Sequence, residues 1–318
     1  MLKENFFEPN RITAENLCEL SFEQAISFEK RICEISELCD SMAKSALILS
    51  EQGLDIYEIL GLLSDNLTVD SSDAPAYALE ENVERVKKYL STISAYDKAL
   101  ISHILTQKMN ARALSVSEAD FLTEGEGNKN ITYVKNRLAD EAYDIFSDLI
   151  SDATVSYTDS FRNAAKAVSE GKSEYCLLPL EEKGGARLAT VASILFAYDL
   201  KIAMVTPVFG YDGSADVKYA LVASHFNIPK YENDDDRYLE IRIKADSQLS
   251  ISSLFAASEL LGASLYRINT VTFNTDDGEE SYFTLVFRGE ESDFSSLLVF
   301  LTLFVREYSA VGIYKNIE

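Results

Sequence analysis

The chain has 318 residues, 47% of them hydrophobic, which is enough for two or three globular domains with cores of their own. Its formal net charge of −23 argues against nucleic acids and anionic membranes as partners, because both are polyanions. Any anionic ligand would therefore have to be held by a local positive site.

Cysteines and histidines are too few and too scattered for a metal centre. Cys18, Cys33, Cys39 and Cys176 show no Cys-x-x-Cys spacing, and the chain has only two histidines. We therefore expect no metal and no cofactor, and reduced thiols in a cytoplasmic protein. The N-terminal segment has no apolar signal core, and the longest apolar run, 297–305, is too short to span a bilayer.

The N-terminal region follows a helical pattern almost throughout, and we expect a helical bundle there. Apolar residues recur at spacings of three and four along 28–49, which places them on one buried stripe of a helix. Gly53 is expected to end that helix, because glycine adopts the left-handed conformation at low cost. A short second helix is predicted over 55–67.

Two longer helices are predicted in the rest of this region. One runs through 83–104, and an amphipathic helix follows over 131–150. Asp97 interrupts the apolar stripe of the first, either as a buried functional carboxylate or through a local shift of the exposed face.

The second half of the chain changes to short apolar runs that alternate with helices, as in an α/β lobe. Strands are predicted near Thr154, Tyr175, Ile202 and Tyr219, in a mostly parallel sheet of about four or five strands. Pro179 is expected to end the second strand, because proline has no N–H for the sheet ladder. A polar turn and a helix follow.

The residues of this turn, Pro179-Leu180-Glu181-Glu182-Lys183, resemble the Pro-Ile-Glu-Asn-Ser segment of prephenate dehydratases. Later blocks occur in the order of that family, and the resemblance covers about 155–318. It implies an α/β lobe of the periplasmic-binding-protein type. Only 207–216 stand where the family has a second lobe, so we expect a single-lobe remnant.

Four positions that carry the chemistry of the family differ in this chain. Val217, Lys218 and Tyr219 stand where the family has Thr-Arg-Phe, and Glu182 stands where it has asparagine. Valine has no hydroxyl to assist a leaving group, and lysine is a point charge rather than a two-pronged donor. The charge of Glu182 would repel a dicarboxylate at short range. The resemblance therefore implies a degenerate site without catalytic residues.

The C-terminal region has the order strand, helix, strand, strand, helix, strand, which is typical of a ferredoxin-like fold. It resembles an ACT domain, the amino-acid-sensing module that follows the dehydratase domain in the family. The resemblance implies a ligand site made of Asp246, Ser247 and Gln248 with Asn269 and Thr270. The glycine and the arginine of the family's ligand motifs are absent, so a structural or dimerising ACT-like fold is the alternative.

Bifunctional relatives carry an N-terminal helical chorismate mutase domain, whose site needs several arginines and lysines. That pattern cannot be placed on Arg31, Lys44, Arg85, Lys87 or Lys88. A helical interaction or dimerisation module is the plainer interpretation of this region.

We therefore predict a multi-domain α and α/β protein with three parts: a helical domain (1–152), a dehydratase-like lobe (153–233) and an ACT-like βαββαβ domain (234–318). The leading hypothesis is a non-catalytic or regulatory homodimer that senses an aromatic amino acid. An active prephenate dehydratase and an interaction scaffold without a small ligand are the alternatives.

Overall fold

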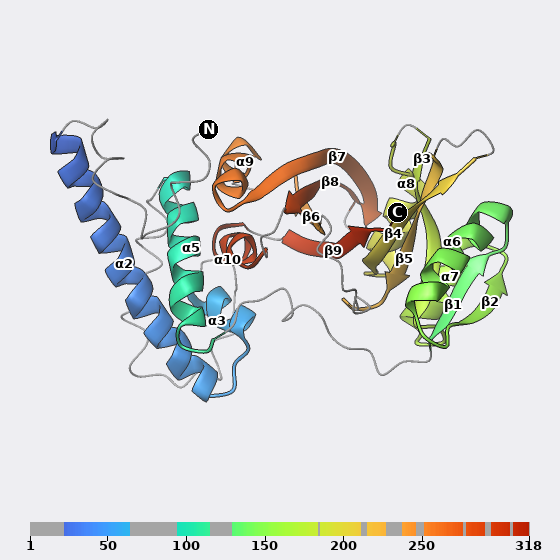
Figure 1. Ribbon diagram of the computed structural model, residues 1–318, viewed down its shortest axis with the longest axis horizontal. Coiled ribbons are helices and arrows are strands. Elements are labelled where there is room, and N and C mark those ends of the chain that lie inside the picture. Colours follow the sequence, from blue (N-terminus) through green and yellow to red (C-terminus); the bar gives the residue numbers. More distant parts are fainter. Residues whose placement is uncertain are drawn as a thin grey trace. The chain divides into compact units, whose positions relative to one another are not determined.

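The computed structural model of the chain describes eight helices and one nine-stranded sheet, which fall into two compact units (Figure 1). A helical unit comprises Met1–Glu118, Asp246–Ser264 and Ser292–Tyr308, and a sheet unit comprises Ala119–Ala245, Leu265–Glu291 and Ser309–Glu318. The residues that the structure describes are 22–63, 94–114, 129–183, 185–210, 215–226, 237–245, 251–275, 278–289, 294–305 and 308–317.

The helical unit contains five described helices. They are α2 (Phe22–Glu51), α3 (Ile56–Leu63), α5 (Ala95–Asn110), α9 (Ile251–Leu260) and α10 (Ser295–Phe304). The apolar stripe predicted on the first helix is buried in the core of this unit, against side chains of α3, α5 and α10. Gly53 follows α2 with a φ of +90°, as expected for a residue that ends a helix. The predicted end of the second helix, after residue 63, lies outside the described residues.

Of the helix predicted through 83–104, residues 83–93 lie outside the described residues, and α5 begins at Ala95 with Ser94 as its cap. The Ser94 hydroxyl accepts a hydrogen bond from the Asp97 N–H, and the Asp97 carboxylate accepts one from the Ser94 N–H, both at 3.3 Å. Asp97 is 2% exposed, and its carboxylate also pairs with Arg31 of α2. A capping box, and not a shift of the exposed face, therefore explains the break in the apolar stripe.

The sheet unit is organised around one mixed sheet. Its strands are β1 (Asn130–Val134), β2 (Thr154–Thr158), β3 (Tyr175–Glu182), β4 (Lys201–Phe209), β5 (Ala215–Ala223), β6 (Arg237–Lys244), β7 (Ala263–Thr275), β8 (Gly278–Gly289) and β9 (Tyr308–Asn316). Their order across the sheet is β2-β1-β3-β5-β4-β9-β6-β8-β7.

All four strands that the sequence predicted in the lobe belong to this sheet, but the prediction of a mostly parallel sheet was wrong. The pairs β1–β2, β1–β3 and β4–β9 are parallel, whereas β3–β5, β4–β5 and β6–β8 are antiparallel. The reason lies in the short connection between β4 and β5. A parallel neighbour would require a crossover of a dozen residues or more, whereas a short loop returns the chain as an antiparallel strand.

The segment 131–150, predicted as one helix, forms a strand followed by a helix. Strand β1 contains three β-branched residues and a tyrosine, which favour a pleated strand. Asn136 then caps α6 (Arg137–Leu149), because its side chain accepts a hydrogen bond from the Ala139 N–H at 3.0 Å. The strong helical periodicity of apolar residues in α6 made the preceding short strand β1 difficult to recognise in the sequence.

Pro179 lies inside β3 and does not end the strand, contrary to the prediction. The strand continues to Glu182, and its register with β5 shifts between Pro179 and Glu181. Such a bulge lets the ladder omit the hydrogen bond that proline cannot donate. As a result Glu181 and Glu182 stay in the sheet, opposite Lys218 and Val217 of β5.

Helices cover both faces of the sheet. α6 packs on one face, with Leu177 of β3, whereas α7 (Phe161–Ser169) and α8 (Ala189–Ala197) pack on the other, with Cys176 and Leu178. Consecutive residues of a strand point to opposite faces, so a strand covered on both sides is apolar at successive positions. This explains the apolar run of β3.

The βαββαβ order predicted for the C-terminal region is present. Strands β6 to β9 are neighbours in the sheet, and helices α9 and α10 belong to the helical unit. β9 also pairs with β4, and Gly312 permits this approach, since a Cβ there would lie 2.7 Å from the Ile202 carbonyl oxygen. One sheet thus contains strands from all three predicted domains. The domain boundaries at 152 and 233 remain predictions.

Candidate functional site

Six charged side chains lie together in the sheet unit, and we name them the buried charge cluster. They are Glu181, Arg187, Lys218, Glu240, Arg242 and Arg267. They come from β3, β5, β6, β7 and the turn before α8. Four are cationic and two are anionic, so the cluster has a surplus of positive charge within a chain of formal charge −23.

Local structure explains how the members of the cluster come to face one another. Glu240 and Arg242 are two positions apart in β6, so both point to the same side of the sheet. The turn between β3 and α8 folds back on the strand and forms an antiparallel bridge between Glu181 and Arg187. Arg187 is thereby held beside the end of the strand.

Glu240 anchors one half of the cluster. Its carboxylate accepts hydrogen bonds from the Arg187 guanidinium and from the Tyr314 hydroxyl, the latter at 3.1 Å. The side chains of Glu240 and Arg187 are 3% and 6% exposed. Burial lowers the pKa of Arg187, but the negative charge of Glu240 and its neighbours outweighs burial and holds that pKa above its usual value. Arg187 therefore stays charged although water hardly reaches it.

Glu181 anchors the other half, where two cations neutralise it. Arg267 donates to its Oε1 atom, and the Lys218 Nζ atom lies 3.7 Å from its Oε2 atom. The Glu181 side chain is buried, and both cations are more accessible than it is. Lys218 is thus a counter-ion within the protein.

Arg242 forms no ion pair with any described residue. Its guanidinium carbon lies 5.0 Å from the centre of the Phe196 ring and 5.4 Å from that of Phe273, and these two rings stack 4.1 Å apart. Burial holds the pKa of Arg242 below its usual value, although the charge of Glu240 acts in the opposite direction. Arg187 and Arg242 therefore differ: Arg187 is paired with a carboxylate, whereas Arg242 lies against aromatic faces.

A small cavity of about 10 Å³ lies beside these arginines. Its polar lining consists of Arg187, Glu240, Arg242, Asn269 and Thr284, and its apolar lining comes from α8, β7 and β9. Three buried nitrogens of these side chains have no hydrogen-bond partner among the described residues: Arg187 Nη1, Arg242 Nε and Asn269 Nδ2. Leaving a buried donor unsatisfied costs about 1–3 kcal/mol, and more for a charged group. The cavity is therefore suited to hold a hydrogen-bond acceptor.

No family model matches this sequence, and no curated protein matches it. The structure is similar to prephenate dehydratase from Streptococcus mutans, with 15% identity, a TM-score of 0.48, and coverage of 59% of this chain and 99% of that chain. It is also similar to GqqA, a quorum-quenching acylase (14% identity, TM-score 0.43, coverage 59% and 95%). A third similar structure is prephenate dehydratase from Arthrobacter aurescens in complex with L-Phe (13% identity, TM-score 0.42, coverage 58% and 89%). Sequence identities and TM-scores this low assign no activity, so proposals on function rest on this chain's own residues.

The four positions that differ from the dehydratase chemistry lie close together on β3 and β5. Glu182 lies opposite Val217, and Glu181 lies opposite Lys218. Val217 and Tyr219 pack in the apolar core on the α6 side, whereas Lys218 faces the buried charge cluster. Burial raises the pKa of the Tyr219 hydroxyl, and Glu182 is exposed. These side chains share two strands but do not converge on one cavity.

The predicted ligand residues are only partly described. Asp246, Ser247 and Gln248 lie outside the described residues. Asn269 and Thr270 are consecutive in β7 and therefore point to opposite sides: Asn269 lines the cavity, and Thr270 is exposed. Asn269 is thus placed with the two arginines, and Thr270 is not.

Sequence reasoning missed Arg187, Glu240 and Arg242. A signal was present in β6, because its sequence Arg-Tyr-Leu-Glu-Ile-Arg-Ile-Lys places two charges at alternate positions inside a largely apolar strand. Charges on the buried side of a strand need partners. Arg187 had no comparable signal, since its partner Glu240 is 53 residues away in the sequence.

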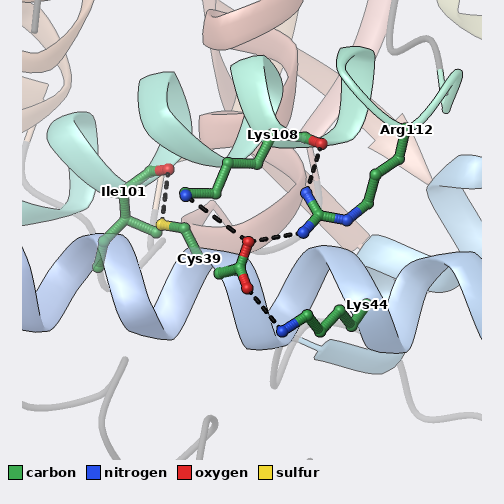
Figure 2. Close-up of polar contacts among 6 residues, drawn as sticks. Cys39, Lys44, Ile101, Lys108 and Arg112 are labelled. Atoms are coloured by element: carbon green, nitrogen blue, oxygen red, sulfur yellow. Dashed lines mark hydrogen bonds and ion pairs between the residues drawn. The ribbon is translucent and has the colours of Figure 1, made fainter.

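A second charged group, which we name the Asp40 group, lies in the helical unit (Figure 2). The Asp40 carboxylate of α2 lies 2.8 Å from the Lys44 Nζ atom, 3.6 Å from the Lys108 Nζ atom and 2.6 Å from the Arg112 Nη2 atom. Hydrogen bonds from Lys44 and Arg112 hold the pKa of Asp40 well below its usual range. These four side chains are between 23% and 66% exposed, so water and salt screen their charges.

Other kinds of site have little support in the described part of the chain. It contains no group of three or more His, Cys, Asp or Glu side chains that could hold a metal ion. None of its helices has the length and hydropathy needed to cross a membrane. Cys39 and Cys176 are buried and Cys33 is exposed, whereas Cys18 lies outside the described residues. Burial raises the pKa of Cys39 to about 12, so that thiol is inert at neutral pH.

Proposed function

We propose that this chain is a non-catalytic, regulatory protein that resembles prephenate dehydratases and senses an aromatic amino acid. The proposed parts are a helical module (1–152), a single dehydratase-like lobe (153–233) and a ferredoxin-like, ACT-like domain (234–318). The observation that carries the proposal is the role of Lys218, which stands where the family has its arginine and is paired with the buried Glu181. A cation already used as a counter-ion is poorly available to a substrate carboxylate.

The neighbouring positions support the same proposal. Val217 packs in the apolar core and has no hydroxyl that could assist the departure of hydroxide. Glu182 is exposed beside it, and its negative charge opposes the approach of a dicarboxylate. Each of these residues has a structural role or an unfavourable charge, so catalysis is not expected from this pair of strands.

We propose that the amino acid binds at Asp246, Ser247 and Gln248 together with Asn269 and Thr270. The buried amide of Asn269, whose Nδ2 atom lacks a partner among the described residues, supports a role in hydrogen bonding. We also propose a homodimer formed through the C-terminal region. The support is strand β7, an edge of the sheet on which Tyr266 and Ile268 are exposed.

An activity assay tests the non-catalytic part of the proposal. The purified chain should convert prephenate to phenylpyruvate no faster than buffer. The double variant Val217→Thr, Lys218→Arg should stay inactive, because the new arginine would still face Glu181. Turnover of the unmodified protein at about 1 per second or more, an ordinary enzymatic rate, would mean that it is an active dehydratase.

Calorimetry tests the sensing part. Phenylalanine, tyrosine or tryptophan at millimolar concentration should give a saturable heat, and the variant Ser247→Trp should lose it while retaining its circular dichroism spectrum. No heat with any of the three amino acids would leave the interaction scaffold as the function. Light scattering should give about twice the 35.5 kDa chain mass for the homodimer.

A further inference from the structure

We propose that the cavity lined by Arg187, Arg242 and Asn269 binds one compact monovalent anion of halide size. The proposal does not require a bound amino acid, but it shares Asn269 with the proposed amino-acid site, so the Nδ2 atom of Asn269 would serve one ligand or the other. With four cations and two carboxylates in the cluster, one bound anion would reduce the surplus of positive charge from two to one.

The donors that would hold the anion come from three separate elements. Arg187 precedes α8, Arg242 lies in β6 and Asn269 lies in β7; each lines the cavity and carries a buried nitrogen that has no partner among the described residues. Arg187 has a side-chain exposure of 6% and Arg242 a total exposure of 7%, so bulk water is a poor substitute partner. Three residues that line one cavity, each with a buried N–H group that lacks a partner among the described residues, provide the donors that an anion requires.

The balance of charge around the cavity favours an anion over a water molecule. The Glu240 carboxylate is paired with Arg187 and accepts a hydrogen bond from the Tyr314 hydroxyl, and the Glu181 carboxylate is paired with Arg267 and Lys218. Arg242 is left as a buried cation that forms no ion pair with any described residue. A water molecule could accept hydrogen bonds there, but only an anion would also neutralise the guanidinium.

The size and the walls of the cavity restrict the anion. A volume of about 10 Å³ corresponds to one water-sized particle. Ala192, Leu195, Val271, Phe273 and Val311 form apolar walls that offer no hydrogen bonds to a larger, more hydrated anion. A halide loses its hydration at moderate cost, whereas a phosphate or a polyhydroxy acid neither fits nor finds enough donors.

Thermal unfolding of the full chain in different sodium salts tests the proposal. The melting temperature should be higher in chloride or bromide than in gluconate, an anion too large for the cavity, at equal ionic strength. Above the dissociation constant it should rise by about 2 °C for each tenfold increase in halide, because the ligand binds only the folded state. Equal melting temperatures in the three salts would overturn the proposal.

Two variants separate binding in the cavity from general salt effects. Arg242→Met should abolish the halide response, whereas Arg112→Met, the same change in the Asp40 group, should keep it. Asn269→Asp preserves the shape of the side chain and places a carboxylate beside the two arginines. It should therefore melt higher than the unmodified chain at low salt and should no longer respond to halide. A full halide response in Asn269→Asp or in Arg242→Met would overturn the proposal.

Discussion

The buried charge cluster and the Asp40 group are made of the same kinds of side chain in different surroundings. In each, cations outnumber carboxylates, but the Glu240 side chain is 3% exposed and that of Asp40 is 33% exposed. Exposed ion pairs contribute little, because water and salt screen them. Removing one partner of a buried pair, by contrast, leaves an uncompensated charge in a medium of low dielectric constant.

The comparison also shows why surplus positive charge has different consequences in the two places. In the Asp40 group, Lys44 has a 66% exposed side chain, and water solvates its charge. In the buried cluster, Arg242 lies against aromatic faces and a cavity and forms no ion pair with any described residue. A requirement for a bound anion therefore follows from burial and not from the number of arginines and lysines.

The largest effect is expected from Glu240→Gln, which leaves Arg187 without its carboxylate. The free energy of unfolding should fall by about 3–5 kcal/mol, as for other broken buried pairs. Urea unfolding followed by circular dichroism measures this change. The matched control is Glu182→Gln, an exposed glutamate of β3, which should change stability by less than about 0.5 kcal/mol. Equal losses in both variants would mean that burial does not distinguish the two sites.

An intermediate effect is expected from Asp97→Ala in the helical unit. This carboxylate is buried, but it pairs with the exposed Arg31 and completes the capping box of α5 with Ser94. Loss of the cap should reduce the free energy of unfolding by about 1–2 kcal/mol. Asp97→Glu should retain most of the stability, because glutamate also completes a capping box. If Asp97→Glu is as unstable as Asp97→Ala, the capping explanation is wrong.

The smallest effect is expected from Asp40→Asn. The shift in melting temperature should be smaller than that of Asp97→Ala, and it should decrease further as sodium chloride is raised, because the side chains of the Asp40 group are accessible to ions. A shift as large as that of Glu240→Gln would contradict the comparison between the two charged groups.

The contribution of Asp40 to stability should depend on pH. The pKa of Asp40 is lower in the folded chain than its usual value, so its stabilising contribution is present above about pH 4 and is lost as the pH falls through the folded pKa. The difference in melting temperature between the unmodified chain and Asp40→Asn should therefore shrink between about pH 4 and pH 2. A difference that grows in this range would show that the carboxylate does not act as a charged partner.

Elements whose signal is local could be predicted from the amino-acid sequence. The stripe on α2, the role of Gly53 and the βαββαβ order follow from spacings of two, three or four residues, which directly reflect strand and helix geometry. The same patterns failed where two signals overlapped. The helical periodicity of α6 obscured the five-residue strand β1. Pro179 did not end β3, because a bulge in the pairing of β3 with β5 accommodates it.

The order of strands in the sheet and the composition of the site depend on contacts between distant segments and could not be predicted. Nothing local requires β9 to pair with β4 or Arg187 to meet Glu240, because these contacts join distant segments. The charges at alternate positions of β6 indicated that partners were needed, but not which residues would supply them. The free energy of a buried charge depends on every group packed around it, and that set exists only once the chain has folded.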